Sequence, residues 1–461
     1  MNDLDFSNLP LAKDLLSNLG SLGYLAMTPI QAQSLPTILA GKDVIGQAKT
    51  GSGKTVAFGL GVLNKLDVKR YNVQSLVICP TRELADQVAT EIRKLARAIQ
   101  NIKVLTVCGG APFGLQASSL KHGVQIVVGT PGRIQDHLDR ETLRLDNIAT
   151  LVLDEADRML EMGFEEAIDE IVRQLPATRQ TLLFSATYPQ QIKGLARRYL
   201  VDPQMVKVDA THDATTIAQS FYEVDKPQKR FDALQLLLLH HRPQSTLVFC
   251  NTKRETQSVA DKLAKRGFSV AALHGDLEQK DRDIALIRFA NKSISILVAT
   301  DVAARGLDII DLDAVINFDI AQDAEIHLHR IGRTGRAGSK GVAYSLFSEQ
   351  EKHRVARFDT EVDPIRHKEP LPPDSCLELA VLKPEMATLR IDAGKKQKIR
   401  AGDILGALTG EQGVVGTQVG KINVAENWAY IAVNRESVRL AHQKLADGKL
   451  KGRSVRVKFV G

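Results

Sequence analysis

The sequence predicts an α/β protein with two tandem domains of doubly wound parallel sheet, followed by a small α+β domain. Two sets of short apolar runs, each separated by helix-like segments, predict the two parallel sheets. After residue 374 the order of strand-like and helix-like segments changes, which predicts the third domain. The length of 461 residues agrees with several domains, because single cores rarely grow beyond about 250 to 300 residues.

The apolar runs lack polar alternation, which is typical of strands covered on both faces. The first set consists of Ser75–Cys79, Val104–Cys108, Val124–Val128, Thr150–Leu153 and Thr181–Phe184. The second set consists of Thr246–Cys250, Val270–Leu273, Ser295–Ala299, Ala314–Phe318 and Val342–Phe347. The polar segment 209–219 between them lacks periodicity and is predicted to be a linker. This assigns residues 1–208 and 220–368 to the two domains.

A proline-rich break separates the third domain, residues 375–461. Three of the six residues in Glu369–Asp374 are prolines, which excludes a helix interior or a central strand. Beyond it we expect the order βαββαβ of a small four-stranded sandwich. The expected elements are Ala387–Ile391, Ala401–Leu408, Gly413–Ile422, Trp428–Val433, Glu436–Leu445 and Ser454–Val460.

The positive charge is concentrated in the third domain. Asp374–Gly461 contains 15 Lys and Arg against 9 Asp and Glu, a difference of +6, whereas the whole chain carries +7. This bias favours a polyanion-binding appendage, although a solvated lysine-rich surface gives the same bias.

The composition, with 44% hydrophobic and 25% charged residues, is typical of a soluble globular protein. The cysteines Cys79, Cys108, Cys250 and Cys376 show no C-x-x-C spacing, which favours buried free thiols over disulfides or zinc ligands. Residues 1–10 lack the features of a signal peptide, and no apolar stretch approaches about 18 residues. We therefore expect a cytoplasmic monomer without a membrane partner.

A glycine-rich segment predicts phosphate binding. It follows an apolar run, precedes a helix-like run and consists of Ala48, Lys49, Thr50, Gly51, Ser52, Gly53, Lys54 and Thr55. Glycines let backbone N–H groups turn around phosphate oxygens, Lys54 can reach the β and γ phosphates of ATP, and Thr55 can ligate Mg²⁺. Ala48 departs from the strict pattern, which opens with glycine, so a chance glycine-rich turn is the alternative.

Carboxylates end a later apolar run, at Asp154, Glu155 and Asp157. Acids at the end of a buried strand are costly unless they bind something. Asp154 is placed to hold Mg²⁺, and Glu155 can polarise the water that attacks ATP. A solvated acidic loop is the alternative.

The sequence Asp-Glu-Ala-Asp at 154–157, together with Ser-Ala-Thr at 185–187, resembles the DEAD-box RNA helicase family. The resemblance implies two RecA-like P-loop domains and RNA-stimulated ATP hydrolysis. It also implies that Thr28, Gln31 and Phe6 recognise adenine. Without it, Phe6 is an ordinary core aromatic and Gln31 a surface residue.

The resemblance continues in the second half, where His-Arg-Ile-Gly-Arg-Thr-Gly-Arg at 329–336 matches the last family motif. It implies that Arg333 and Arg336 act as arginine fingers on the γ phosphate, while Gly306 and Asp308 contact ATP. It also implies that Asp157, Ser185, Thr187 and His329 couple the two domains.

The resemblance further assigns contacts to the RNA backbone. In the first domain these are Pro80, Thr81, Arg82, Gly110, Thr130, Pro131, Gly132 and Arg133; in the second they are Gln279, Arg282 and Thr300. Such groups bind phosphates and cannot read bases, so we expect binding that tolerates any sequence and weakens with salt.

The third domain partly matches an RRM, because Trp428 and Tyr430 alternate on one predicted strand. Arg390 stands where that fold usually has an aromatic ring, so Trp428 and Tyr430 are either base-stacking or core residues. Arg390 is itself counted among the predicted RNA contacts. The better candidates for binding structured RNA are then the basic side chains of Lys395, Lys396, Lys398, Arg400 and the segment 449–458.

A DEAD-box core with such a basic tail resembles a bacterial branch of the family, which implies 23S rRNA as target and a role in large-subunit assembly. Two alternatives stay open. One is a P-loop helicase acting on DNA, and the other is an RNA clamp that binds ATP without productive unwinding.

Overall fold

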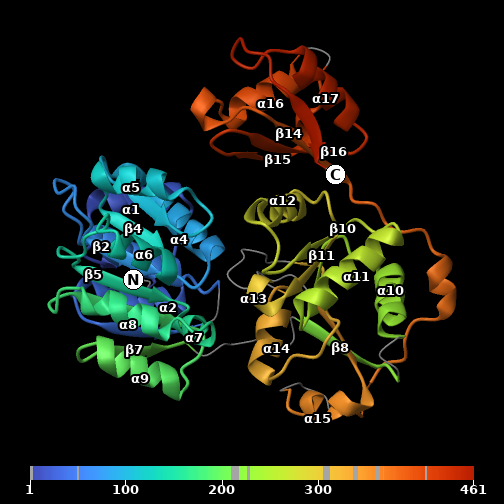
Figure 1. Ribbon diagram of the computed structural model, residues 1–461, viewed down its shortest axis with the longest axis horizontal. Helices are drawn as coiled ribbons and strands as arrows, with labels where there is room; N and C mark the ends of the chain where they lie inside the picture. The colour runs from blue at the N-terminus through green and yellow to red at the C-terminus, as the bar shows by residue number, and fades with distance from the viewer. Residues whose placement is uncertain are drawn as a thin grey trace. The chain divides into compact units, whose positions relative to one another are not determined.

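The computed structural model describes residues 4–48, 51–208, 217–225, 229–304, 312–335, 341–358, 364–366, 368–410 and 413–460. It contains two compact units, one built on the described residues up to 208 and one on those from 217 onward. The second unit contains two separate sheets (Figure 1).

The first unit is built on seven parallel strands in the order β3-β4-β2-β5-β6-β1-β7. Its strands are β1 (Val44–Gln47), β2 (Ser75–Ile78), β3 (Val104–Val107), β4 (Ile126–Gly129), β5 (Thr150–Asp154), β6 (Gln180–Ser185) and β7 (Gln204–Lys207). Its helices are α1 (Lys13–Ser21), α2 (Pro29–Leu39), α3 (Lys54–Asn64), α4 (Arg82–Leu95), α5 (Phe113–Lys121), α6 (Pro131–Asp139), α7 (Ala156–Glu161), α8 (Glu165–Arg173) and α9 (Gln190–Tyr199).

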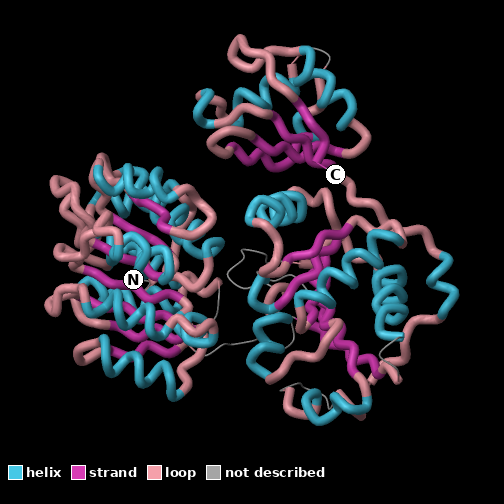
Figure 2. The backbone as a smooth tube through the Cα atoms, in the orientation of Figure 1, coloured by secondary structure: helices cyan, strands magenta, loops and turns pink. Residues whose placement is uncertain are grey.

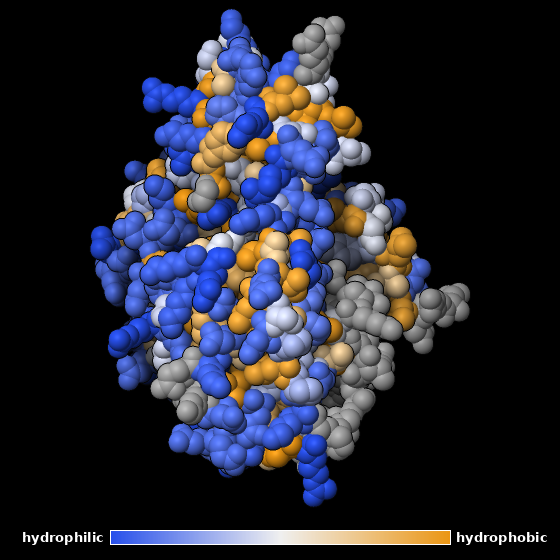
Figure 3. Space-filling model, turned by 90° about the vertical axis from the view of Figure 1, so that its right-hand side faces the viewer, coloured by the Kyte–Doolittle hydropathy of each residue, from blue (hydrophilic) through white to orange (hydrophobic). Residues whose placement is uncertain are grey.

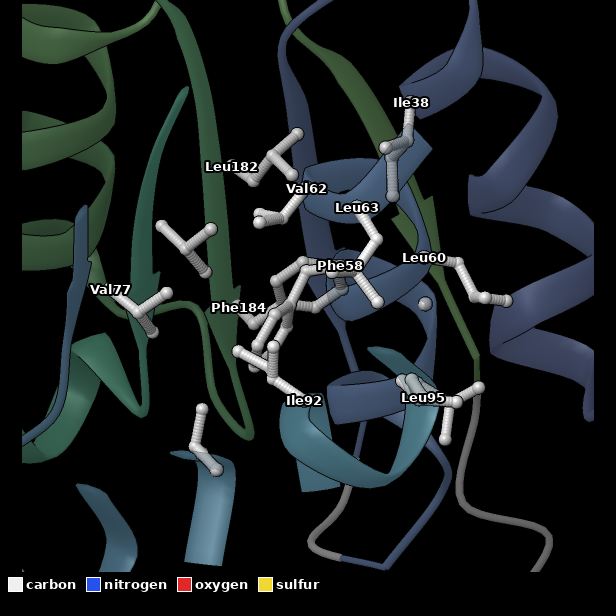
Figure 4. Close-up of a cluster of buried hydrophobic side chains, with 14 of the residues drawn as sticks. Ile38, Phe58, Leu60, Val62, Leu63, Val77, Ile92, Leu95, Leu182 and Phe184 are labelled. Carbon is white, nitrogen blue, oxygen red and sulfur yellow. The ribbon is translucent and has the colours of Figure 1, made fainter. Parts of the chain in front are cut away.

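Both faces of this sheet are buried, as its unbroken apolar runs predict. Along β2, Val77 belongs to the hydrophobic cluster that includes α1 to α4, whereas Leu76 and Ile78 belong to the cluster that includes α6 to α9. Figure 4 shows the first cluster, in which Phe58 of α3 lies against Phe184 of β6, with ring centroids 5.4 Å apart. The sheet is thus held rigidly between two helical layers.

The second unit begins with six parallel strands in the order β10-β11-β9-β12-β13-β8. They are β8 (Ile217–Glu223), β9 (Thr246–Cys250), β10 (Val270–Leu273), β11 (Ile296–Thr300), β12 (Ala314–Asn317) and β13 (Gly341–Phe347). The helices are α10 (Arg230–His241), α11 (Lys253–Lys265), α12 (Gln279–Ala290), α13 (Asp301–Ala304), α14 (Ala324–Ile331) and α15 (Lys352–Val355). Figure 2 shows helices on both sides of the strands in each of the two larger sheets.

The chain ends in a four-stranded antiparallel sheet in the order β15-β16-β14-β17. Its elements are β14 (Met386–Ile391), α16 (Ala401–Thr409), β15 (Val419–Val424), β16 (Ala429–Asn434), α17 (Val438–Asp447) and β17 (Val457–Val460). The two helices and one face of the sheet share a single core. The predicted βαββαβ order and the RRM-like description are confirmed.

Several details differ from the sequence prediction: β1 was not among the predicted strand runs, and β17 begins at Val457 rather than Ser454. Strand β7 was not predicted because, at this sheet edge, only Val206 is buried. Strand β8 was also missed, and it begins at Ile217, inside the predicted linker; residues 209–216 lie outside the described ranges. Strand β15 begins at Val419, later than Gly413, because Gly416–Gln418 forms a 3₁₀ turn. Trp428 lies one residue before β16.

All four cysteines are buried and free, as expected. No helix within the described ranges combines the length and apolar character needed to cross a bilayer. Figure 3 shows one face of the molecule, which is mainly hydrophilic with scattered apolar residues.

Candidate nucleotide and RNA sites

The strand order places the residues predicted to bind ATP and those predicted to bind RNA at neighbouring parts of one edge of the first sheet. Strands β5, β6 and β1 are neighbours, so their carboxyl ends bring Asp154, Ser185 and Ala48 to the same part of the edge. Strands β3, β4 and β2 are also neighbours and carry the loops predicted to contact RNA. Ligands of parallel α/β sheets bind at this edge.

The P-loop turns into α3 through two glycines in the left-handed region. Gly51 has φ +81° and Gly53 has φ +94°, and Gly53 caps the N-terminus of α3. The dihedral angle favours glycine at Gly53, and an added Cβ, 2.5 Å from Gln31 Nε2, would also displace the Gln31 side chain. Lys49 and Thr50 lie outside the described residues.

Lys54 and Asp154 form the buried charged centre of this edge. The Lys54 ammonium donates to the carbonyl oxygen of Ala48, and both Lys54 and Asp154 are almost fully buried. Burial lowers the pKa of Lys54, although the charges of Asp154 and Glu155 oppose this effect. Burial likewise raises the pKa of Asp154 to about 7, while Lys54 acts to lower it. A cationic ligand would relieve the cost of ionising Asp154.

Glu155 is held in an unusual backbone conformation, with φ +52°. Its carboxylate lies 3.2 Å from Arg158 Nε, and both side chains are almost fully buried. Strained positive-φ residues are found preferentially at functional sites. Arg158 was not among the predicted site residues; its i+3 spacing from Glu155 on a new helix was the available signal.

Asp157 connects the acidic motif to the Ser-Ala-Thr motif. Its Oδ2 accepts hydrogen bonds from the backbone N–H and the hydroxyl of Thr187, each at 3.0 Å. Its own N–H donates to Ser185 Oγ at 3.3 Å. The structure thus brings together three of the four residues predicted to couple the domains.

The predicted adenine-recognition element lies against the P-loop. Gln31 Oε1 accepts from the Thr28 N–H at 2.9 Å, and Gln31 Nε2 donates to the Gly53 carbonyl at 3.1 Å. Phe6 is 4% exposed and belongs to the hydrophobic core, so its present position matches the core alternative. Gln31 is buried and not a surface residue. Contact of either residue with adenine stays a prediction.

The three predicted RNA-contact loops of the first unit follow adjacent strands. Thr81 caps α4 by accepting from the Leu84 N–H at 3.2 Å; Pro80 before it is buried and Arg82 after it is half-buried. Arg82 Nη1 donates to the Gly109 carbonyl at 3.4 Å. Thr130 precedes α6, where Pro131 takes the first helical position and Gly132 is exposed. Gly110 is exposed, with φ +77°.

In the second unit, Arg330 is a buried hub next to the predicted arginine fingers. It is 1% exposed and donates to Asp301, Asn251, Asn317 and the carbonyl of Asp319. Arg333 is 3% exposed, one turn further on. Arg336, Gly306 and Asp308 lie outside the described residues, so the roles predicted for them stay predictions, as does that of His329.

The second unit contains three further predicted RNA contacts, one at the end of strand β11 and two on helix α12. Thr300 ends β11 and is buried, and its hydroxyl accepts from the Ala303 N–H at 3.4 Å. Gln279 begins α12 and donates to Asp283 at 2.8 Å; Arg282 lies on the same helix, one turn from it.

Comparison with known proteins decides the family. The DEAD/DEAH box helicase profile matches residues 28–195, and the helicase conserved C-terminal domain profile matches residues 229–338. The chain belongs to the DEAD-box family of ATP-dependent RNA helicases. A third profile, the DbpA RNA binding domain, matches residues 388–459 of this helicase.

The helicase is similar to named relatives along nearly its whole length. It is 53% identical over 445 residues to the ATP-dependent RNA helicase DbpA of Escherichia coli (strain K12), covering 96% of this chain and 97% of the relative. It is 45% identical to the DEAD-box ATP-dependent RNA helicase CshA of Bacillus subtilis (strain 168) over 80% of this chain and 74% of the relative. These relatives support RNA over the DNA alternative.

A solved structure shows a similar fold with both ligands present. The structure of S. cerevisiae Dbp5 bound to RNA and ADP BeF3 matches the helicase with a TM-score of 0.70 and 27% identity, covering 81% of this chain and 98% of that one.

The third domain of the helicase presents two basic loops side by side. Lys395, Lys396, Lys398 and Arg400 lie exposed on the loop before α16, and Lys449, Lys451, Arg453 and Arg456 lie exposed before β17. The Lys451 ammonium donates to the Lys398 carbonyl at 2.7 Å and lies 3.0 Å from Asp403, which ties the loops together. We call these eight residues the basic loop pair.

The predicted stacking residues of the third domain, Trp428 and Tyr430, are less exposed to solvent than its basic loops. Tyr430 is 4% exposed and lies outside the domain's core cluster, whereas Trp428 is 38% exposed. Arg390 lies over the Trp428 ring, with 6.0 Å from its Cζ to the ring centroid. Of the two predicted stacking residues, only Trp428 is exposed, whereas all eight residues of the basic loop pair are exposed. Contact of either group with RNA stays a prediction.

Proposed function

We propose that this helicase hydrolyses ATP at the edge of the first sheet and remodels structured RNA, with 23S rRNA in assembling large ribosomal subunits as its target. The basic loop pair carries the proposal of an rRNA target, because eight exposed cations on two tethered loops offer a phosphate-binding surface separate from the helicase core. The similarity to DbpA, which covers the third domain as well as the helicase core, also supports the proposal.

The residues at the sheet edge fit ATP with Mg²⁺. Ser52 Oγ is buried without a hydrogen-bond partner among the described residues, and Asp154 is an acid whose pKa is raised to about 7 by burial, so a bound cation would favour its ionised form. Thr55 and Asp154 would hold Mg²⁺, which when bound supplies positive charge to phosphate oxygens. Lys54 would bind the β and γ phosphates, and its ammonium already lies at the P-loop, where it donates to the Ala48 carbonyl.

Glu155 would orient the attacking water. The positive φ of Glu155 sets the direction in which its side chain leaves the backbone, and the ion pair with Arg158 holds its carboxylate in place. Arg333 and Arg336 would complete the site as arginine fingers when RNA is bound, so that hydrolysis depends on RNA. Release of phosphate would then let the RNA go.

The rRNA target is tested in the full-length protein by removing charge from the basic loop pair. The double variant Lys395→Gln/Lys396→Gln is compared with Lys421→Gln/Arg439→Gln, which removes two exposed charges elsewhere in the same domain. We expect the first variant to lose most of its preference for 23S rRNA over bulk RNA in stimulating ATP hydrolysis, while its maximal rate is kept. Equal preference in both variants would argue against the proposal.

A further inference from the structure

A buried polar network links two of the loops predicted to bind RNA in the first unit. Gln116 of α5 is 5% exposed and lies at its centre. Its Nε2 donates to the carbonyl of Cys108 at 3.0 Å, immediately before Gly109 and Gly110. Its Oε1 accepts from Arg133 Nη1 at 3.3 Å, in the first turn of α6, which follows the loop at Thr130.

His137 completes the network from the other side. The ring is fully buried, and its Nε2 lies 3.0 Å from Gln116 Oε1. Because the Gln116 amide nitrogen is used on Cys108, its oxygen is the acceptor, and His137 Nε2 carries the proton. His137 Nδ1 lies 2.8 Å from the Thr142 hydroxyl, so the orientation of the ring is fixed at both nitrogens.

Arg133 is held in one direction by three neighbours. Besides Gln116, its Nε lies 3.7 Å from Asp136, and its guanidinium lies 5.8 Å from the centroid of the Phe113 ring. Phe113 is itself stacked on His137, with centroids 4.1 Å apart. The guanidinium retains donors beyond the one spent on Gln116, because arginine has five N–H groups in a rigid fork.

We propose that Gln116 is a positioning residue for RNA: its oxygen sets the direction of Arg133, and its amide nitrogen fixes the Gly109–Gly110 loop in register with it. This inference rests on the RNA-contact role of Arg133 predicted above. One buried amide thus holds two phosphate-binding loops, on neighbouring strands β3 and β4, at a fixed spacing. Such preorganisation reduces the ordering cost of binding a strand.

The test is a double-mutant cycle on Gln116 and Arg133, read by RNA-stimulated ATP hydrolysis of the full-length protein. We expect Gln116→Met to raise the KM for single-stranded RNA about threefold to tenfold and to leave kcat within about twofold. The slope of log KM against log salt concentration is expected to fall by about 0.7, the value for one lost phosphate contact with a single strand. A loss of general stability would not change this slope.

Arg133→Met separates this inference from the RNA role on which it rests. We expect Arg133→Met alone to raise KM and reduce the slope. In the Gln116→Met/Arg133→Met double variant, KM is expected to rise further by less than Gln116→Met alone raises it, because only the bond to Cys108 remains to be lost. If Arg133→Met acts and Gln116→Met does not, or if their effects on KM multiply, positioning by Gln116 is wrong. If Arg133→Met changes neither KM nor slope, the RNA role of Arg133 fails first and the inference fails with it.

Two further variants and one control guard against misfolding. Gln116→Glu keeps an acceptor oxygen for Arg133 and His137 but loses the N–H that donates to the Cys108 carbonyl, so its KM is expected to lie between those of the wild type and Gln116→Met. Gln116→Asn keeps the amide but withdraws its oxygen by one methylene, and it repeats the test if Gln116→Met does not fold. Gln135→Met on α6 removes a similar amide, which bonds Glu170 away from these loops, and is expected to leave KM unchanged.

Discussion

Asp157 accepts two hydrogen bonds from Thr187, one from its backbone N–H and one from its hydroxyl, both at 3.0 Å. The last acid of the Asp-Glu-Ala-Asp motif is therefore oriented by the residue that ends the Ser-Ala-Thr motif, two residues after the neighbouring strand β6. Asp157 and Thr187 are not among the residues predicted to act on ATP, namely Lys54, Asp154 and Glu155. A change in the pair should therefore affect the coupling of ATP hydrolysis to duplex unwinding more than ATP hydrolysis itself.

Thr187→Val removes the hydroxyl and keeps the backbone contact with Asp157. We expect RNA-stimulated ATP hydrolysis to stay within about threefold of the wild type, while duplex unwinding falls about tenfold, because one hydrogen bond to a charged group is lost. Both rates are measured on the same preparation, with Thr90→Val on the exposed face of α4 as control. An equal fall in both rates would place Thr187 in hydrolysis and not in coupling.

Arg158→Met leaves the Glu155 carboxylate buried without its cation. Breaking one side of a buried ion pair costs about 3 kcal/mol of unfolding free energy, and the displaced carboxylate should lower kcat at saturating RNA by about tenfold or more. Chemical denaturation and phosphate release measure the two effects. Arg173→Met, at the exposed end of α8, is expected to change neither. An unchanged kcat in Arg158→Met would remove Arg158 from the site.

Gly53→Ala tests the geometry of the P-loop. The added Cβ meets Gln31 Nε2 at 2.5 Å and Thr28 Oγ1 at 2.9 Å, and φ +94° is strained for alanine. We expect ATP affinity to fall at least about tenfold in equilibrium titration with a fluorescent ATP analogue. Gly194→Ala on α9, where no atom lies within 4 Å of the new Cβ, should bind ATP normally. Normal ATP binding by Gly53→Ala would mean that the loop adopts another conformation when it binds nucleotide.

The stability of the second unit should depend on Glu255. Burial and the neighbouring Asp319 carboxylate raise the pKa of Glu255 to about 7, above its ordinary value of 4.5. The protonated form is therefore favoured in the folded state. Its contribution to stability is complete below about pH 4.5, declines as the pH rises and is lost above about pH 7.

This dependence is measured as the difference in unfolding free energy between the wild type and Glu255→Gln across pH 5 to pH 8. Glutamine stays neutral, so the wild type should lose about 1 to 2 kcal/mol relative to the variant over this range, after allowance for solvent screening. A constant difference would show that Glu255 does not titrate there.

Much of the fold was predictable because buried parallel strands have a distinctive apolar pattern. Ten of the thirteen described strands of the two large sheets were among the predicted strand runs, and β1, β7 and β8 were not. Strand β7 was missed since its one buried residue, Val206, leaves no run to detect. Phosphate and acid motifs were found because their spacing is local. Gln116, His137 and Arg158 were missed because their roles depend on partners brought together by folding, and a single glutamine or arginine on a helix carries no pattern.

Side-chain burial was the least predictable property. Tyr430 alternates with Trp428 in the sequence, yet the first is buried and the second is exposed, because Trp428 precedes the strand. Gln31 is likewise a polar residue on a helix that packs against the P-loop backbone. In both cases tertiary contacts decide the exposure.

The dependence of ATP hydrolysis on RNA is tested most directly by steady-state phosphate release from the full-length protein, with and without saturating 23S rRNA. We predict that RNA stimulates phosphate release at least about tenfold, because RNA is needed to complete the site with the arginine fingers. We also predict that Glu155→Gln loses the stimulated rate, because the attacking water is no longer oriented by a carboxylate. The same rate with and without RNA would contradict this dependence.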